Sequence, residues 1–162
     1  MPLNPLILRY PTERQIKIWV LTRKYLSGKE IAEKEGITRP AVSQNLRVAN
    51  QRIKDLLENT ARSNKICIEL LSKKYGYVRG YSAMFKVRAY ITYSPENGLQ
   101  VWYDHKGHCE NCEEFGDCRR IILQEFKERQ ITVPNEALRP TELGEILFEK
   151  IEDAIRKDKG RK

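Results

Sequence analysis

The sequence predicts an α+β protein. An N-terminal trihelical helix-turn-helix unit with a long, coiled-coil-like third helix precedes a small α+β metal-binding domain that contains a β-hairpin. Apolar residues recur at helical spacing as far as residue 70 and alternate with polar residues between 85 and 103, and closely spaced cysteines follow. We therefore divide the chain into a helix-turn-helix unit (1–57), a continuing helix that links and dimerises (58–76), and a C-terminal domain (77–162).

Length and composition fit a water-soluble protein of one or two small domains. The 162 residues are 40% hydrophobic and 32% charged. No run approaches the ~20 apolar residues that cross a bilayer. Met1–Tyr10 lacks the basic segment and the cleavage site of a signal peptide. We expect a cytoplasmic protein without membrane contact, in which Met1–Tyr10 is an arm packed on the body.

The net charge of +8 is unevenly distributed along the chain. Residues 38–90 carry eleven Lys and Arg against three Asp and Glu, whereas residues 91–162 carry twelve against fifteen. A polyanion bound to the positive segment would gain free energy from counterion release. The alternative is a solvated basic face without a partner.

Local signals predict that three helices begin before residue 57. Capping boxes at Thr12–Gln15 and Ser27–Glu30 begin the first two. Gly36 supplies a left-handed residue for the turn that follows. Thr38 caps the third helix, and Pro40 stands in its first turn, where a missing N–H costs nothing. This order is typical of a helix-turn-helix unit.

The third helix has the pattern of a recognition helix. Val42 and Leu46 face inward, and the polar residues fall on the opposite surface: Arg39, Ser43, Gln44 and Arg47, with Thr38 at the cap. Arginine can pair with guanine edges and glutamine with adenine in the major groove. Three further basic residues are candidates for phosphate contact: Arg14, Lys29 and Arg52.

Three segments resemble a known family. Thr12-Glu13-Arg14-Gln15, Glu30-Ile31-Ala32 and Thr38-Arg39-Pro40-Ala41-Val42-Ser43 resemble the DNA-binding part of the archaeal Tfx family. More broadly, they are similar to sigma-factor region 4 and LuxR-type helix-turn-helix domains. The resemblance covers roughly residues 10–57. It implies a transcriptional regulator that binds double-stranded DNA, and it implies nothing about the C-terminal part.

Apolar and small residues continue past the recognition segment in steps of four and three. They are Val42, Leu46, Ala49, Ile53, Leu56, Thr60, Ser63, Cys67 and Leu70. We call this series the seam. No proline or glycine intervenes before Gly76, so the seam predicts a helix that reaches about Tyr75 and pairs with a second copy in a homodimer. The alternatives are a helix packed on its own domain, or two helices with a bend near 59–64.

The second half begins with a predicted hairpin. Residues 85–93 alternate as a half-buried strand, Ser94–Gly98 forms a turn, and residues 99–103 return. Gly76–Ser82 is predicted to be a hinge or an added edge strand. Two amphipathic helices complete the chain, one after Cys118 and one beginning at Pro140, with a possible short strand at 131–133 between them.

The spacing H-x3-C-x2-C-x5-C predicts a metal site formed by Cys109, Cys112, Cys118 and His105. Three thiolates and one imidazole form a tetrahedral zinc site. Asp117 is expected to cap the next helix and to place Cys118 in its first turn. His108 is an alternative fourth ligand, and so is Cys67, which would favour an iron–sulfur cluster.

Two other interpretations of the cysteines stay open. They could be a redox- or metal-sensing switch with DNA binding as its output, or free thiols without metal. Cys67 by itself is expected to be a buried seam residue. We do not expect an enzyme, because a closed set of thiolate ligands leaves no open metal position for catalysis.

Overall fold

The computed structural model describes residues 10–161, so the predicted N-terminal arm lies outside the described residues except for Tyr10. The elements are α1 (Glu13–Arg23), α2 (Gly28–Glu35), α3 (Arg39–Ser63), β1 (Ile66–Ser72), β2 (Tyr77–Ser82), β3 (Val87–Ser94), β4 (Gly98–Tyr103), a short 3-10 turn (Cys109–Asn111), α4 (Phe115–Glu128) and α5 (Pro140–Lys159). The strands form one antiparallel sheet in the order β1-β2-β3-β4. The predicted α+β class is confirmed.

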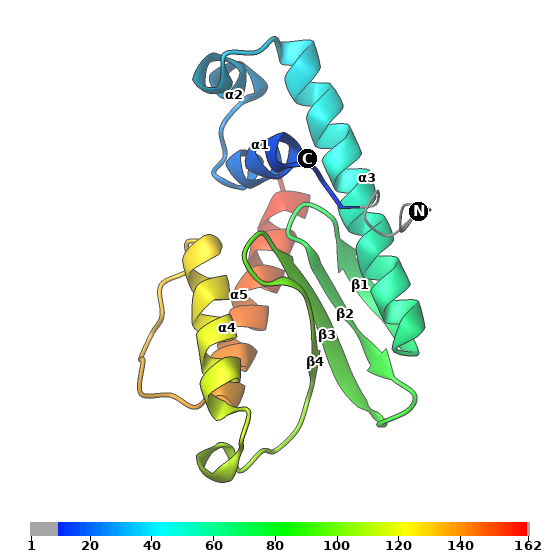
Figure 1. The fold of residues 1–162 in the computed structure, drawn as a ribbon, viewed down its shortest axis with the longest axis vertical. Coiled ribbons are helices and arrows are strands. Elements are labelled where there is room, and N and C mark those ends of the chain that lie inside the picture. The colour runs from blue at the N-terminus through cyan, green and yellow to red at the C-terminus, as the bar shows by residue number, and fades with distance from the viewer. Residues whose placement is uncertain (1–9, 162) are drawn as a thin grey trace, which may run out of the picture.

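The sheet is the middle layer of the molecule. α3 lies against one face, and α4 and α5 cover the other (Figure 1). α2 and the first turns of α3 extend beyond the end of the sheet, while the loop that carries the cysteines lies at the opposite end (Figure 1). No helix among residues 10–161 is long and apolar enough to cross a membrane.

The three N-terminal helices begin where the local signals predict, and α2 also ends where they predict. Thr12 and Ser27 each form a capping box with the residue three positions on. Gly36 ends α2 in the left-handed region at φ 64°. The Thr38 hydroxyl oxygen accepts a hydrogen bond from the Ala41 N–H at 3.2 Å. A small core joins the helices: Ile18, Leu21, Ile31, Ala32 and Val42.

The predicted continuation of α3 to Tyr75 is wrong. The helix ends at Ser63, and the Asn64 side-chain amide donates to the Thr60 carbonyl at 2.9 Å. Lys65 then adopts a left-handed φ of 53°, which turns the chain into β1. Cys67 and Leu70 of the seam therefore lie on a strand, and Cys67 is exposed rather than buried.

The apolar face of α3 packs on its own sheet. Ala49 and Ile53 are fully buried in a core with Val78, Ala89 and Ile91 of the sheet. This core supplies the hydrophobic burial that the seam was predicted to obtain from a second copy. The alternative of a helix packed on its own domain is therefore correct, and the observation behind the predicted homodimer is removed.

The predicted hairpin is confirmed as β3 and β4, with Ser94 paired to Gly98 across the turn. Gly76–Ser82 is neither a hinge nor an edge strand, because β2 pairs with β1 on one side and with β3 on the other. Residues 131–133 form no strand. Sequence periodicity identified β3 and β4, but it could not assign β1, whose apolar residues continue the helical spacing of α3.

The second face of the sheet holds a separate core under α4 and α5. Its fully buried members include Tyr77, Phe126, Leu143 and Leu147. The Tyr77 hydroxyl donates to Glu152 of α5 at 2.7 Å. These contacts fix α5, whose first turn faces the cysteine loop, relative to the sheet.

A buried cluster of charges connects α1 to α4. Arg129 ion-pairs with Glu125 at 2.8 Å, and their side chains are 3% and 0% exposed. Arg23, at the end of α1, stacks on Trp19 with its guanidinium carbon 4.1 Å from the ring centroid. Burial, and then the charge of Arg129, lower the pKa of Arg23 to about 9. The helical unit and the C-terminal half thus share one interior.

Candidate functional site

The predicted DNA-contacting side chains gather on the first turns of α3. All four are exposed: Arg39, Ser43, Gln44 and Arg47. On the opposite surface of the same turns, Val42 is 3% exposed and belongs to the trihelical core. The helix that carries these residues extends beyond the sheet (Figure 1), so no other described element covers its polar surface.

Two of these side chains hold each other in place. The Arg47 guanidinium donates to the Gln44 side-chain oxygen at 3.1 Å. Residues three apart on a helix are neighbours on its surface, so this pair is a single hydrogen-bonding unit. It leaves the Gln44 amide N–H2 and the remaining guanidinium N–H groups as donors for a partner. Thr38 uses its hydroxyl in the helix cap and is a positioning residue at this surface.

The three predicted phosphate-contacting residues differ in their surroundings. Arg14 is exposed on α1, and Lys29 is exposed at the start of α2, 4.0 Å from Glu33. Arg52 is half-buried and already has hydrogen-bond partners within the protein. Its guanidinium donates to the Tyr10 carbonyl at 3.1 Å and to the Gln15 side-chain oxygen at 3.2 Å. Arg52 therefore fastens α3 to the start of α1 and is a weaker candidate for phosphate contact.

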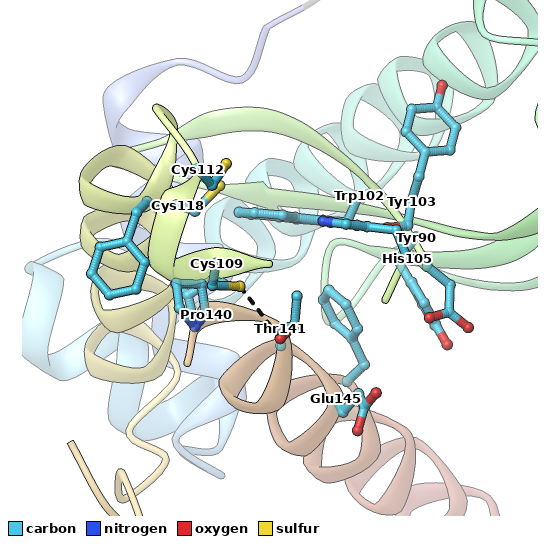
Figure 2. Close-up of a pocket in the computed structure, with 15 residues that line it drawn as sticks. Tyr90, Trp102, Tyr103, His105, Cys109, Cys112, Cys118, Pro140, Thr141 and Glu145 are labelled. Atoms are coloured by element: carbon cyan, nitrogen blue, oxygen red, sulfur yellow. Dashed lines mark hydrogen bonds between the residues drawn. The ribbon is translucent and has the colours of Figure 1, made fainter. Parts of the chain in front are cut away.

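The cysteines form a second candidate site at the other end of the molecule. A cavity of about 110 Å³ lies between the sheet, the loop that follows β4, and the start of α5. Its lining includes all the predicted ligands: His105, Cys109, Cys112 and Cys118. Aromatic side chains, among them Tyr90 and Trp102, form part of its wall (Figure 2). The tertiary structure thus places all four predicted metal ligands in the lining of one cavity.

Each thiol has a different environment. Cys109 is buried, and its sulfur lies 3.6 Å from the Thr141 hydroxyl oxygen of α5 (Figure 2). Cys112 is exposed. Cys118 lies in the first turn of α4, as predicted, with its N–H bonded to the Glu114 carbonyl at 2.8 Å. Burial first, and then the nearby Cys112 and Glu114, raise the pKa of the Cys118 thiol.

The predicted cap of this helix is wrong. α4 begins at Phe115 with Glu114 at the cap position, and Asp117 sits inside the first turn, where it pairs with Arg120 at 3.5 Å. An acidic side chain there still suits the positive end of the helix dipole. Capping signals are ambiguous here because three acidic residues, Glu113, Glu114 and Asp117, lie within one turn.

The candidates for a fourth ligand are separated by the fold. His105 lines the cavity, whereas His108 and Cys67 do not. Cys67 lies on β1, at the far edge of the sheet from β4, so it cannot join the other three sulfurs without unfolding the sheet. As the side chains stand, no three Cys, His, Asp or Glu residues among the described part of the chain surround a single point as metal ligands do.

Comparisons with protein-family models, with curated proteins and with solved structures found no match for this chain. The resemblance to the Tfx family therefore stays a prediction that rests on the quoted residues. The two candidate sites stand on their geometry alone.

Sequence reasoning missed two groups near the cysteines. Thr141 contacts the Cys109 sulfur from α5, and the Tyr103 carbonyl oxygen lies 2.8 Å from Nδ1 of His105. Thr141 is distant in sequence, and a carbonyl belongs to every residue, so no motif could mark them. Only the approach of α5 to the loop reveals the first contact.

Proposed function

We propose that this chain is a sequence-specific regulator of transcription that binds double-stranded DNA through the first turns of α3. The exposed polar surface formed by Arg39, Ser43, Gln44 and Arg47 is the observation that carries the proposal. An isolated helix end with this composition, backed by a small core, matches what a major groove accepts.

The surrounding charge supports this proposal. Arg14 and Lys29 are exposed on α1 and α2, the two helices that flank the recognition surface. Basic groups beside a recognition helix would contact phosphates and set its orientation, while the side chains on the helix itself would distinguish bases. The net positive charge of residues 38–90 would add a sequence-independent attraction for DNA.

The test begins with selection of preferred duplexes from a random-sequence pool by the purified full-length chain. Binding of the selected duplex and of a shuffled duplex is then measured by fluorescence anisotropy at several salt concentrations. We expect Gln44→Ala to weaken binding to the selected duplex by about 1–3 kcal/mol and to leave the affinity for the shuffled duplex almost unchanged. Lys29→Ala should weaken both duplexes alike and reduce the salt slope by about one.

Lys150→Ala is the matched control for the lysine variant. Lys150 is exposed on α5, so its removal changes the net charge equally without altering the recognition surface. It should leave the affinity for both duplexes close to that of the unaltered chain. Failure of the pool to enrich any sequence would contradict specific binding, and so would equal losses from Gln44→Ala on both duplexes.

A further inference from the structure

We propose that the loop after β4 binds one zinc ion in a tetrahedral site, with the sulfurs of Cys109, Cys112 and Cys118 and Nε2 of His105 as its ligands. This inference is independent of DNA binding. It rests on the shared cavity, on the hydrogen bond that sets the tautomer of His105, and on the position of Cys67 at the far edge of the sheet.

The donor set comes first. Three thiols and one imidazole line one cavity of about 110 Å³. Thiolate and imidazole are the ligands that zinc takes in closed structural sites. The fold thus places ligands from the loop and from the first turn of α4 in the lining of the same cavity.

The hydrogen bond of His105 sets the tautomer that a metal ligand needs. Its Nδ1 lies 2.8 Å from the Tyr103 carbonyl oxygen, which can only accept a hydrogen bond. Nδ1 therefore carries the proton, and Nε2 keeps its lone pair for a metal. A side chain at position 107 would begin 2.8 Å from Nε2, so Gly107 keeps the space beside this nitrogen free.

Cys109 has an outer-shell partner as well. Its sulfur lies 3.6 Å from the Thr141 hydroxyl oxygen. Once the sulfur is a zinc-bound thiolate, this hydroxyl donates to it. Such second contacts orient metal ligands and strengthen binding.

The ion itself completes the site. No three ligands surround one point in the described chain, so binding of zinc requires the loop to move until His105 and the three sulfurs surround the ion. Zinc sites commonly form together with the metal, because deprotonated thiolates repel one another without it. Gly107 lies within this loop and allows its backbone to adjust.

The fold also argues against an iron–sulfur cluster with four cysteine ligands. Cys67 is the only other cysteine of the sequence, and it lies on β1 at the far edge of the sheet. The loop and the first turn of α4 therefore offer three sulfurs, and the His105 imidazole lines the same cavity. That combination favours zinc over clusters that take four thiolates.

The experiment uses the purified full-length chain, measured by elemental analysis and by absorption after replacement of zinc with cobalt(II). We expect one zinc per chain, no visible colour, and cobalt bands typical of a tetrahedral site with thiolate ligands. Cys109→Ser, Cys112→Ser, Cys118→Ser and His105→Ala should each weaken binding by more than the ~10-fold to ~100-fold that loss of an outer-shell contact costs. Thr141→Ala should fall within that range.

Two matched controls come from the chain itself. His108→Ala and Cys67→Ser remove the same chemical groups outside the cavity and should keep one zinc per chain. Loss of metal in the other variants could result from misfolding, so His105→Cys replaces one ligand with another. This variant should still bind cobalt and should show additional thiolate-to-metal absorption. The proposal is overturned if the unaltered chain binds neither zinc nor cobalt, if iron and visible absorption co-purify, or if His108→Ala loses the metal while His105→Ala keeps it.

Discussion

The two halves of α3 differ although they belong to one uninterrupted helix. In the first turns, polar side chains such as Gln44 and Arg47 are exposed, and Val42 on the inner surface packs in the trihelical core. In the second half, Ile53 and Leu57 are fully buried against the sheet. One helix therefore contributes to two cores. Packing of its C-terminal half on the sheet fixes the position of its exposed N-terminal turns.

The comparison shows why a regular apolar repeat is ambiguous. Ala49, Ile53 and Leu56 have the spacing of a dimer seam, and the same spacing also fits the face of a sheet. Periodicity records which face of a helix is buried but not what buries it. The predictions below use this difference between the halves, beginning with the largest expected effect.

Ile53→Ala tests the buried half. Removal of a fully buried isoleucine side chain should lower the free energy of unfolding by about 2–5 kcal/mol, because a cavity replaces its contacts with the sheet. Chemical denaturation followed by circular dichroism measures the change. The dimer-seam interpretation would be restored by a variant that keeps its unfolding midpoint but sediments as a monomer where the unaltered chain sediments as a dimer.

Arg47→Ala tests the exposed half, on the same helix. We expect the affinity for the selected duplex to fall by about 1–3 kcal/mol, since the pair with Gln44 is lost together with the guanidinium. The free energy of unfolding should change by less than ~0.5 kcal/mol, as is usual for an exposed side chain. Anisotropy and denaturation on the same sample measure the two quantities. A large loss of stability would show that the exposed half also contributes to folding, contrary to the proposed difference between the halves.

Thr38→Ala tests the start of the helix, which belongs to the exposed half but positions all of it. Loss of the hydrogen bond to the Ala41 N–H should cost about 1 kcal/mol of stability. DNA affinity should fall less than in Arg47→Ala, because no base contact is removed. Thr38→Ser keeps a capping hydroxyl and should restore stability. Equal stability of the Ala and Ser variants would argue against the cap.

The smallest expected effect concerns α2, which packs beside the exposed half. A hydrogen bond from the Ser27 backbone N–H holds the pKa of Glu30 below its ordinary value of 4.5. The folded-state pKa lies below the unfolded one, so this contribution to stability is present above pH 4.5 and is lost as the pH falls through the folded-state pKa. In Glu30→Gln this acid-dependent contribution should disappear. Chemical denaturation measures the free energy of unfolding at pH 7 and pH 3. The difference in this free energy between the unaltered chain and the variant should be larger at pH 7. An equal difference at both pH values would contradict the assignment.

The candidate sites were predictable to different degrees. The exposed surface of α3 follows from Thr38, Pro40 and the inward-facing Val42, which are local signals confirmed by the helix boundaries. The cysteine cluster also stands out by its spacing, and the structure brings it to one cavity. The hydrogen bonds of Arg52 to Tyr10 and Gln15 could not be predicted, because they join segments that are far apart in sequence.

By itself, the sequence determined the features that depend on a few neighbouring residues. The capping boxes, the left-handed turn at Gly36 and the hairpin turn at Ser94–Gly98 are of this kind, because each is a hydrogen bond or a backbone preference within about four positions. Tertiary structure alone decided where α3 ends, what covers its apolar face, and which histidine lines the cavity with the cysteines. Those outcomes depend on a sheet assembled from distant strands, which competes for the same apolar residues and places His105, but not His108, at the cavity.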